Sequence, residues 1–135
     1  IDKGIFNFKN KIKDEKKILN LLKRKKIKLV CLAGFMKILS KNFIKIFSYP
    51  ILNIHPSLLP KYKGLDVHKR VIINRERYTG CTVHIVSNKL DSGKIILQKK
   101  IKIYKKDNPI SLEKRLLKHE NKIYPMAVKK VCSNL

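Results

Sequence analysis

A dense apolar segment near the start of the chain limits its fold more than any other feature. The segment, Ile27–Phe35, has apolar residues on both of the alternating faces that a strand presents. This pattern is typical of a strand that is covered on both faces in a parallel sheet. A segment that Ser40 can cap as a helix follows, and Ile51–His55 then gives a second apolar strand that ends at Pro56. We therefore expect a parallel pair joined by a helical crossover, with residues 27–35 at the centre of the sheet.

The remaining segments predict three more helices and two more strands. Helices are expected over Asp14–Arg24 with Asp14 as the N-cap, from Asp66 to about Asn74, and over Ser111–Val131, where Pro125 kinks the helix or starts a new one. Residues 80–86 and 94–104 are expected to form two strands joined by an exposed loop. The predicted fold class is α/β, a single Rossmann-like domain over residues 1–135, with three layers and a mainly parallel sheet.

Sheets of this class usually begin with a strand that leads into a glycine-rich turn at a helix N-terminus, where phosphate binds. The residues before Ile27 contain no such turn, and the chain starts with Ile1 rather than Met. We therefore expect the first βαβ unit, with its phosphate-binding turn, to be missing from these residues.

The charge of the chain first suggests a nucleic-acid partner. The sequence has 33 Lys and Arg against 9 Asp and Glu, a formal net charge of +24. However, 28 of the cations are Lys and only 5 are Arg, and they are spread along the whole chain. This distribution favours a solvated surface that attracts anionic small molecules, so we expect no nucleic-acid partner. A basic nucleic-acid-binding module stays the alternative from another class, and it requires the cations to form one surface stripe.

Neither a membrane span nor a disulfide framework is predicted. The longest apolar run, Leu29–Met36, is far shorter than the roughly 20 residues that cross a bilayer. The three cysteines, Cys31, Cys81 and Cys132, are widely separated and form no CxxC pair, so neither disulfides nor a zinc site are expected. We expect a reducing, cytoplasmic location and no metal. Oligomeric state stays open.

Asn53 and His55 are the first candidates for chemistry, because residues two apart on a strand share a face. The strand ends at Pro56, so both should lie at the C-terminal edge of the sheet, where α/β folds bind ligands. A carboxylate is needed to hold the imidazole protonated, and Asp91 is the best candidate. The alternatives are a capping Asn, a core His and a turn Asp.

Glu120 is the second unusual carboxylate, because it shares a helix face with Leu116, Leu117, Ile123 and Tyr124. Either a lysine pairs with it, or a bound ligand donates to it. His68, His84 and His119 are weaker candidates for the site, and no spacing of the four histidines suggests a metal site.

Four motifs in order make the chain resemble the phosphoribosylglycinamide formyltransferases from Ile27 to Pro125. They are Leu32–Ser40 (LAGFMKILS), Asn53–Lys61 (NIHPSLLPK), Gly80–Val86 (GCTVHIV) with Leu90-Asp91, and His119-Glu120 with Ile123–Pro125. The resemblance implies a formyltransferase fold whose phosphate-binding Gly-Ser-Asn turn would lie in the missing first unit.

The resemblance also implies a reaction and the residues that carry it. A formyl group would pass from 10-formyltetrahydrofolate to the amine of glycinamide ribonucleotide in purine biosynthesis. Asn53, His55 and Asp91 would be catalytic. The folate site would include Lys11, Asn53, Leu90 and the segment Met36, Lys37, Ile38 and Leu39, and the other substrate would contact Glu120, Pro56 and Thr82.

Related folate enzymes stay open as alternatives. Methionyl-tRNA formyltransferase shares Ser57–Pro60 but usually continues with Arg-Gly-Ala-Ala-Pro, where this chain has Lys63–His68 (KGLDVH). Formyltetrahydrofolate deformylase is also similar, although Pro56 and residues 65–68 favour the glycinamide enzyme. Three departures from the family pattern concern the folate loops: Lys37 in place of a common Arg, Lys63 in place of a Pro, and Ser92 in place of Gly or Thr.

Overall fold

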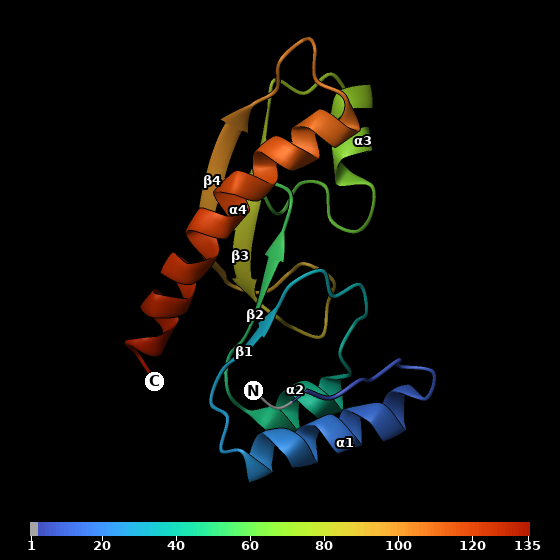
Figure 1. Cartoon of the computed structure of the whole chain (residues 1–135), viewed down its shortest axis with the longest axis vertical. Coiled ribbons are helices and arrows are strands. Elements are labelled where there is room, and N and C mark those ends of the chain that lie inside the picture. The colour runs from blue at the N-terminus through green and yellow to red at the C-terminus, as the bar shows by residue number, and fades with distance from the viewer. Residues whose placement is uncertain (1–2) are drawn as a thin grey trace.

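A computed structural model describes residues 3–135 as a four-stranded sheet with four helices (Figure 1). The strands, β1 (Val30–Leu32), β2 (Ile51–His55), β3 (Tyr78–Ile85) and β4 (Ile95–Lys102), lie in the order β1-β2-β3-β4. The pair β1–β2 is parallel, as predicted, but β2–β3 and β3–β4 are antiparallel. The sheet is therefore mixed, and the prediction of a mainly parallel sheet is wrong for these residues. The short connection from β3 to β4 contains no crossover helix, so those two strands have to run in opposite directions.

Strand β1 lies at the edge of the described sheet rather than at its centre. It is only three residues long, its hydrogen-bonded neighbour in this sheet is β2, and Cys31 is exposed. The prediction of a central strand is thus wrong within residues 3–135. The apolar pattern of residues 27–35 reports what covers the faces of a strand, and it carries no information on which backbone groups pair along its edges.

The helices are α1 (Lys11–Arg24), α2 (Lys41–Phe47), α3 (Val67–Ile73) and α4 (Pro109–Cys132). Ser40 caps α2 as predicted, since its hydroxyl accepts from the Phe43 N–H at 3.0 Å. The cap of α1 is Asn10 and not Asp14, which lies inside the first turn. Asp66 holds the N-cap position of α3 without a side-chain cap bond.

Helix α4 starts with a capping box of Asn108 and Ser111 and continues through Pro125. Proline cannot donate to the carbonyl four residues earlier, which is that of Asn121. Both Pro125 and Asn121 are exposed, so water can satisfy that carbonyl and the helix need not end. No helix within residues 3–135 combines the length and apolar character that crossing a bilayer requires.

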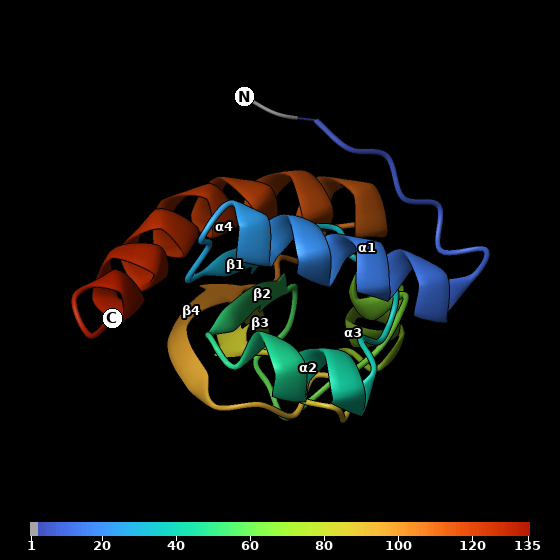
Figure 2. The same cartoon turned by 90° about the horizontal axis from the view of Figure 1, so that it is seen from below.

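The helices cover the two faces of the sheet. Residues of α3 and α4 pack with Leu52, Cys81 and Val83 in one buried cluster. Residues of α1 and α2 pack with Ile51 in a second cluster. Ile51 and Leu52 belong to different clusters because consecutive side chains of a strand leave opposite faces. Figure 2 accordingly shows α4 and α2 on opposite sides of the strands.

Candidate active site

A pocket of about 700 Å³ opens at the C-terminal end of β2. It is walled by the loop after β1, the loop after β2, the β3–β4 loop and the first half of α4. This position is the one in which α/β sheets commonly bind their ligands. Its lining includes Asn53 and nine other predicted site residues: Met36, Lys37, Ile38, Leu39, His55, Pro56, Leu90, Asp91 and Glu120.

Asn53, His55 and Asp91 meet in this pocket. The His55 Nδ1 and Asp91 Oδ2 atoms are 3.4 Å apart, and the two side chains are 8% and 7% exposed. Asn53 lies two residues before His55 on β2, and its buried Oδ1 has no hydrogen-bond partner among the described residues. A buried amide oxygen without a partner is costly, which fits a side chain that is completed by a ligand.

The β3–β4 loop positions Asp91. The Gly64 N–H donates to Asp91 Oδ2 at 2.9 Å, which links this carboxylate to the loop after β2. The nearby Gly93 is required sterically, because a Cβ atom built there would lie 1.6 Å from the Ile85 carbonyl oxygen. The substituted residues Lys63 and Ser92 bond each other across the two loops, at 2.7 Å between Nζ and Oγ. These loops thus approach closely over the carboxylate despite the substitutions.

The other nitrogen of His55 is also engaged. Its Nε2 lies 2.8 Å from the backbone carbonyl oxygen of Tyr62. A carbonyl only accepts, so Nε2 carries a proton. Nδ1 faces a carboxylate, and the doubly protonated ring is the one form in which both contacts are attractive. Nδ1, beside Asp91, is then the nitrogen whose proton can take part in a reaction in the pocket.

Two of the weaker histidine candidates also line the pocket. Burial lowers the pKa of His84, and its Nε2 lies 3.7 Å from Asp91 Oδ1. Burial also lowers the pKa of His68, whose buried Nδ1 has no hydrogen-bond partner among residues 3–135. Both rings are expected to be neutral at pH 7. His119, the third, is not part of the pocket lining.

Glu120 faces the pocket from α4. Burial, followed by the charge of Glu113, raises the pKa of this carboxyl group. No lysine forms an ion pair with Glu120 among the residues that the structure describes. The predicted alternative in which a lysine pairs with Glu120 is therefore not observed. Glu120 and Glu113 together favour a positively charged or hydrogen-bond-donating group at this wall of the pocket.

Two predicted site residues lie outside this pocket. Lys11 is exposed at the start of α1, and it does not belong to the lining. Thr82 is fully buried on β3, where its hydroxyl donates to the Ser57 carbonyl at 2.7 Å and accepts from the Leu59 N–H at 3.2 Å. Thr82 thus holds the loop after β2 from beneath, and its role in substrate binding stays a prediction.

Two further residues of the site were not predicted: Tyr62 and Gly64 contact His55 and Asp91 through backbone atoms. A backbone carbonyl or N–H has no side-chain signature, so no residue pattern could have identified these contacts. The described residues contain no group of three His, Cys, Asp or Glu side chains able to hold a metal ion.

Comparisons with known proteins identify relatives of this chain. The formyl transferase family model matches residues 3–128. A phosphoribosylglycinamide formyltransferase of Haemophilus influenzae is 42% identical over 123 residues, which make up 91% of this chain and 58% of that protein. The structure of the enzyme of that name from Bacillus halodurans superposes with a TM-score of 0.87 at 32% identity, over 93% of this chain and 65% of that one.

The structure of the namesake from Streptococcus pneumoniae gives a TM-score of 0.85 at 31% identity, over 92% of this chain and 69% of that one. The chain therefore spans less than two thirds of the length of the Haemophilus and Bacillus proteins.

Proposed function

This chain belongs to the phosphoribosylglycinamide formyltransferase family, and from that premise we propose that its pocket transfers a formyl group from 10-formyltetrahydrofolate to the amine of glycinamide ribonucleotide. The observation that carries the proposal is the meeting of Asn53, His55 and Asp91 in one pocket, with 3.4 Å between the imidazole and the carboxylate. Glycinamide ribonucleotide is the substrate that the names of the relatives suggest.

The reaction begins when the amine nitrogen of the nucleotide attacks the formyl carbon. A carbon–nitrogen bond forms, and the formyl oxygen takes up negative charge in a tetrahedral intermediate. The Asn53 amide donates a hydrogen bond to this oxygen, and the protonated His55 ring donates a second one from Nδ1. Donors of this kind contribute about 3 kcal/mol each when they are fixed in advance. Two donors from one strand are held without reorganisation.

The reaction ends when the bond between the formyl carbon and the folate nitrogen breaks. His55 gives its Nδ1 proton to that nitrogen, which leaves as an amine. Asp91 accepts the proton that the attacking amine loses, through a water molecule. The close contact between the two groups lets the proton return from Asp91 to His55 after each turnover.

The two walls of the pocket suit the two substrates. The segment from Met36 to Leu39, together with Leu90, supplies apolar surface for the pterin, and Met36, Ile38 and Leu90 are exposed there. The unpaired carboxylate of Glu120 suits the glycinamide part, which brings N–H donors and an amine.

The test is a formyl-transfer assay with purified protein. The chain is assayed with 10-formyltetrahydrofolate and glycinamide ribonucleotide as the two substrates. Asn53→Ala and His55→Ala are each expected to lower kcat by at least about 100-fold. Near-normal kcat in both variants would refute the proposal.

The alternatives predict different outcomes in the same assay. Formylation of methionyl-tRNA without formylation of glycinamide ribonucleotide would assign the chain to another folate formyltransferase. Release of formate from the folate without an acceptor would indicate a deformylase. A nucleic-acid-binding module predicts tight, salt-dependent binding of a duplex that survives substitution of Asn53 and His55.

A further inference from the structure

We propose that Tyr62 and Glu76 form a positioning pair that holds the Tyr62 carbonyl against His55 and so reserves the Nδ1 proton for catalysis. The proposal deepens the proposed function, and its kinetic part rests on it. Its structural part concerns the state of one imidazole ring and can be tested without any activity.

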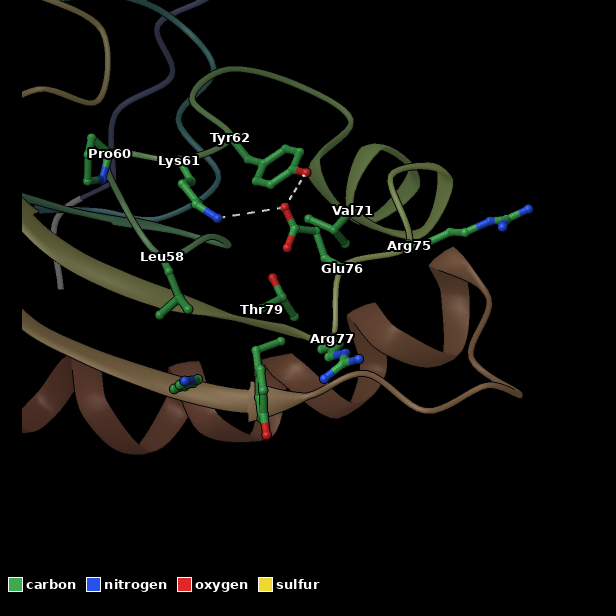
Figure 3. Close-up of a pocket in the computed structure, with 11 residues that line it drawn as sticks. Leu58, Pro60, Lys61, Tyr62, Val71, Arg75, Glu76, Arg77 and Thr79 are labelled. Carbon is green, nitrogen blue, oxygen red and sulfur yellow. Dashed lines mark hydrogen bonds and ion pairs between the residues drawn. The ribbon is translucent and has the colours of Figure 1, made fainter.

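Tyr62 is bound at both of its ends. Its carbonyl accepts from His55 Nε2 at 2.8 Å. Its hydroxyl donates to Glu76 Oε1 at 2.8 Å and accepts from Asn74 Nδ2 at 2.9 Å. Figure 3 shows that Tyr62 and Lys61 reach the same carboxylate oxygen of Glu76. The Lys61 Nζ atom lies 3.8 Å from Glu76 Oε1. The side chain is thus held at its tip while the backbone at its base contacts His55.

The rest of the loop is held by α3. Arg70 of α3 donates through Nη1 to the carbonyls of Lys63 and Leu65 at 2.7 and 3.1 Å. Its guanidinium also lies 5.2 Å from the centre of the Tyr62 ring. The loop is therefore tied to α3 and, through Glu76, to the segment before β3.

Tyr62 and Glu76 act from outside the catalytic pocket. They line a separate pocket of about 550 Å³ between the loop after β2, α3 and β3, and neither contributes to the lining of the catalytic pocket (Figure 3). The Glu76 side chain is 30% exposed there. The influence of this pair on the reaction must therefore pass through the Tyr62 backbone to His55.

The contact selects one state of the ring. A neutral His55 protonated on Nδ1 alone would set the Nε2 lone pair against the Tyr62 carbonyl, which is repulsive at 2.8 Å. A proton is thus kept on Nε2, and any second proton goes to Nδ1, beside Asp91. If the Tyr62 carbonyl moves away, the single-proton form on Nδ1 becomes allowed. The ring then no longer needs a second proton to satisfy its neighbours.

The first measurement is long-range proton–nitrogen NMR of the histidine rings in the whole chain. It reports which ring nitrogens of His55 carry protons and how fast the Nε2 proton exchanges with water. We compare Tyr62→Phe, which removes the hydroxyl, with Glu76→Ala, which removes its acceptor. Glu76→Gln keeps an acceptor and serves as the rescue variant, and Tyr104→Phe is the control for loss of an exposed hydroxyl elsewhere.

We expect Nε2 of His55 to be protonated in the unmodified chain. Its exchange should become about tenfold faster in Tyr62→Phe and in Glu76→Ala, because each loses a hydrogen bond to a charged group. Exchange should stay near its original rate in Glu76→Gln and Tyr104→Phe. An unprotonated Nε2, or unchanged exchange in both Tyr62→Phe and Glu76→Ala, would overturn the proposal. If Glu76→Ala does not fold, Tyr62→Phe decides by the same criteria.

The second measurement separates kcat from KM in the formyl-transfer assay. Tyr62→Phe should lower kcat about tenfold and change the KM of either substrate by less than about threefold, since no substrate contact is lost. A fall in kcat with an unchanged His55 spectrum would mean a merely structural role and would refute the positioning pair. If Tyr62→Phe changes the His55 spectrum but His55→Ala does not affect formyl transfer, the structural role of the Tyr62–Glu76 pair is supported and the proposed function is refuted.

Discussion

Replacing Asp91 by Asn tests the proposed mechanism most directly, because the change is isosteric and its cost can be worked from the structure. The Gly64 N–H can still donate to the amide oxygen, so the two loops stay joined. That bond and the contact with His55 Nδ1 both involve Oδ2, so the amide NH₂ group takes the place of Oδ1, on the side of His84 Nε2. The negative charge beside Nδ1 is gone, so a second proton on the His55 ring loses its ion-pair partner.

The magnitude follows from the distance between the charges. Opposite charges at 3.4 Å attract by about 5 kcal/mol at an effective dielectric constant of about 20. Since His84 is neutral, it adds little to this interaction. A loss of about 5 kcal/mol corresponds to a decrease of 10³- to 10⁴-fold in kcat. The KM of either substrate should change much less, because the charge acts on the reacting proton.

The assay is single-turnover formyl transfer at saturating substrates, which isolates the chemical step from product release. Asp107→Asn is the matched control, because Asp107 is equally buried but pairs with Arg115 at the start of α4. That control should lose stability and keep its kcat. A kcat for Asp91→Asn within tenfold of the original, in a folded protein, would refute the role of Asp91 as the partner of a protonated His55.

Three further predictions concern single groups. Glu120→Gln should raise the KM for the amine substrate at least about tenfold, and an unchanged KM would contradict the role of Glu120. The same change should raise Tm at pH 7.5, because burial raises the pKa of Glu120 and its unpaired charge at that pH opposes folding. In the unmodified protein, the same KM should increase as the pH falls and Glu120 becomes protonated. Burial opposes the charge of Asp107, but hydrogen bonds from the Tyr104 N–H, Ser111 and Arg115 outweigh this effect and lower its pKa. The free energy of unfolding, measured with urea, should therefore fall as the pH drops below the ordinary pKa of 3.8. The fall should be smaller in Asp107→Asn, which lacks this carboxyl group. Burial raises the pKa of Cys81 to about 12, so mass spectrometry should find this thiol unmodified by iodoacetamide at pH 8, in contrast to the exposed Cys132.

The local structure of the chain followed well from its sequence. The helices at residues 11–24, 41–47, 67–73 and 109–132 and the four strands all occur within a few residues of their predicted positions. Periodicity and capping are local properties, since they depend on residues at most four apart. The predicted helix ends were wrong where two nearby residues could both cap the helix, as Asn10 and Asp14 could at the start of α1.

Strand direction and strand order did not follow in the same way. The antiparallel pairing of β3 with β2 depends on the path of the loop from Pro56 to Asp66, which no periodic pattern encodes. That path includes the bonds from Ser57 to the Lys61 carbonyl and from Thr82 to the Ser57 carbonyl. The bond from Thr82 joins residues 25 apart in the sequence, which become neighbours only after the chain has folded.

For the site, the sequence by itself determined that Asn53 and His55 share one face at the end of a strand, because side chains alternate along any strand. It also singled out Asp91 as the candidate partner of His55 and Glu120 as a carboxylate on an apolar helix face. Only the tertiary structure decided that Asp91 lies 3.4 Å from His55 and that the Tyr62 carbonyl oxygen contacts His55 Nε2. The reason is physical: a distance across two loops, and the position of a backbone carbonyl that every residue possesses, are set by packing and not by the identity of any one side chain.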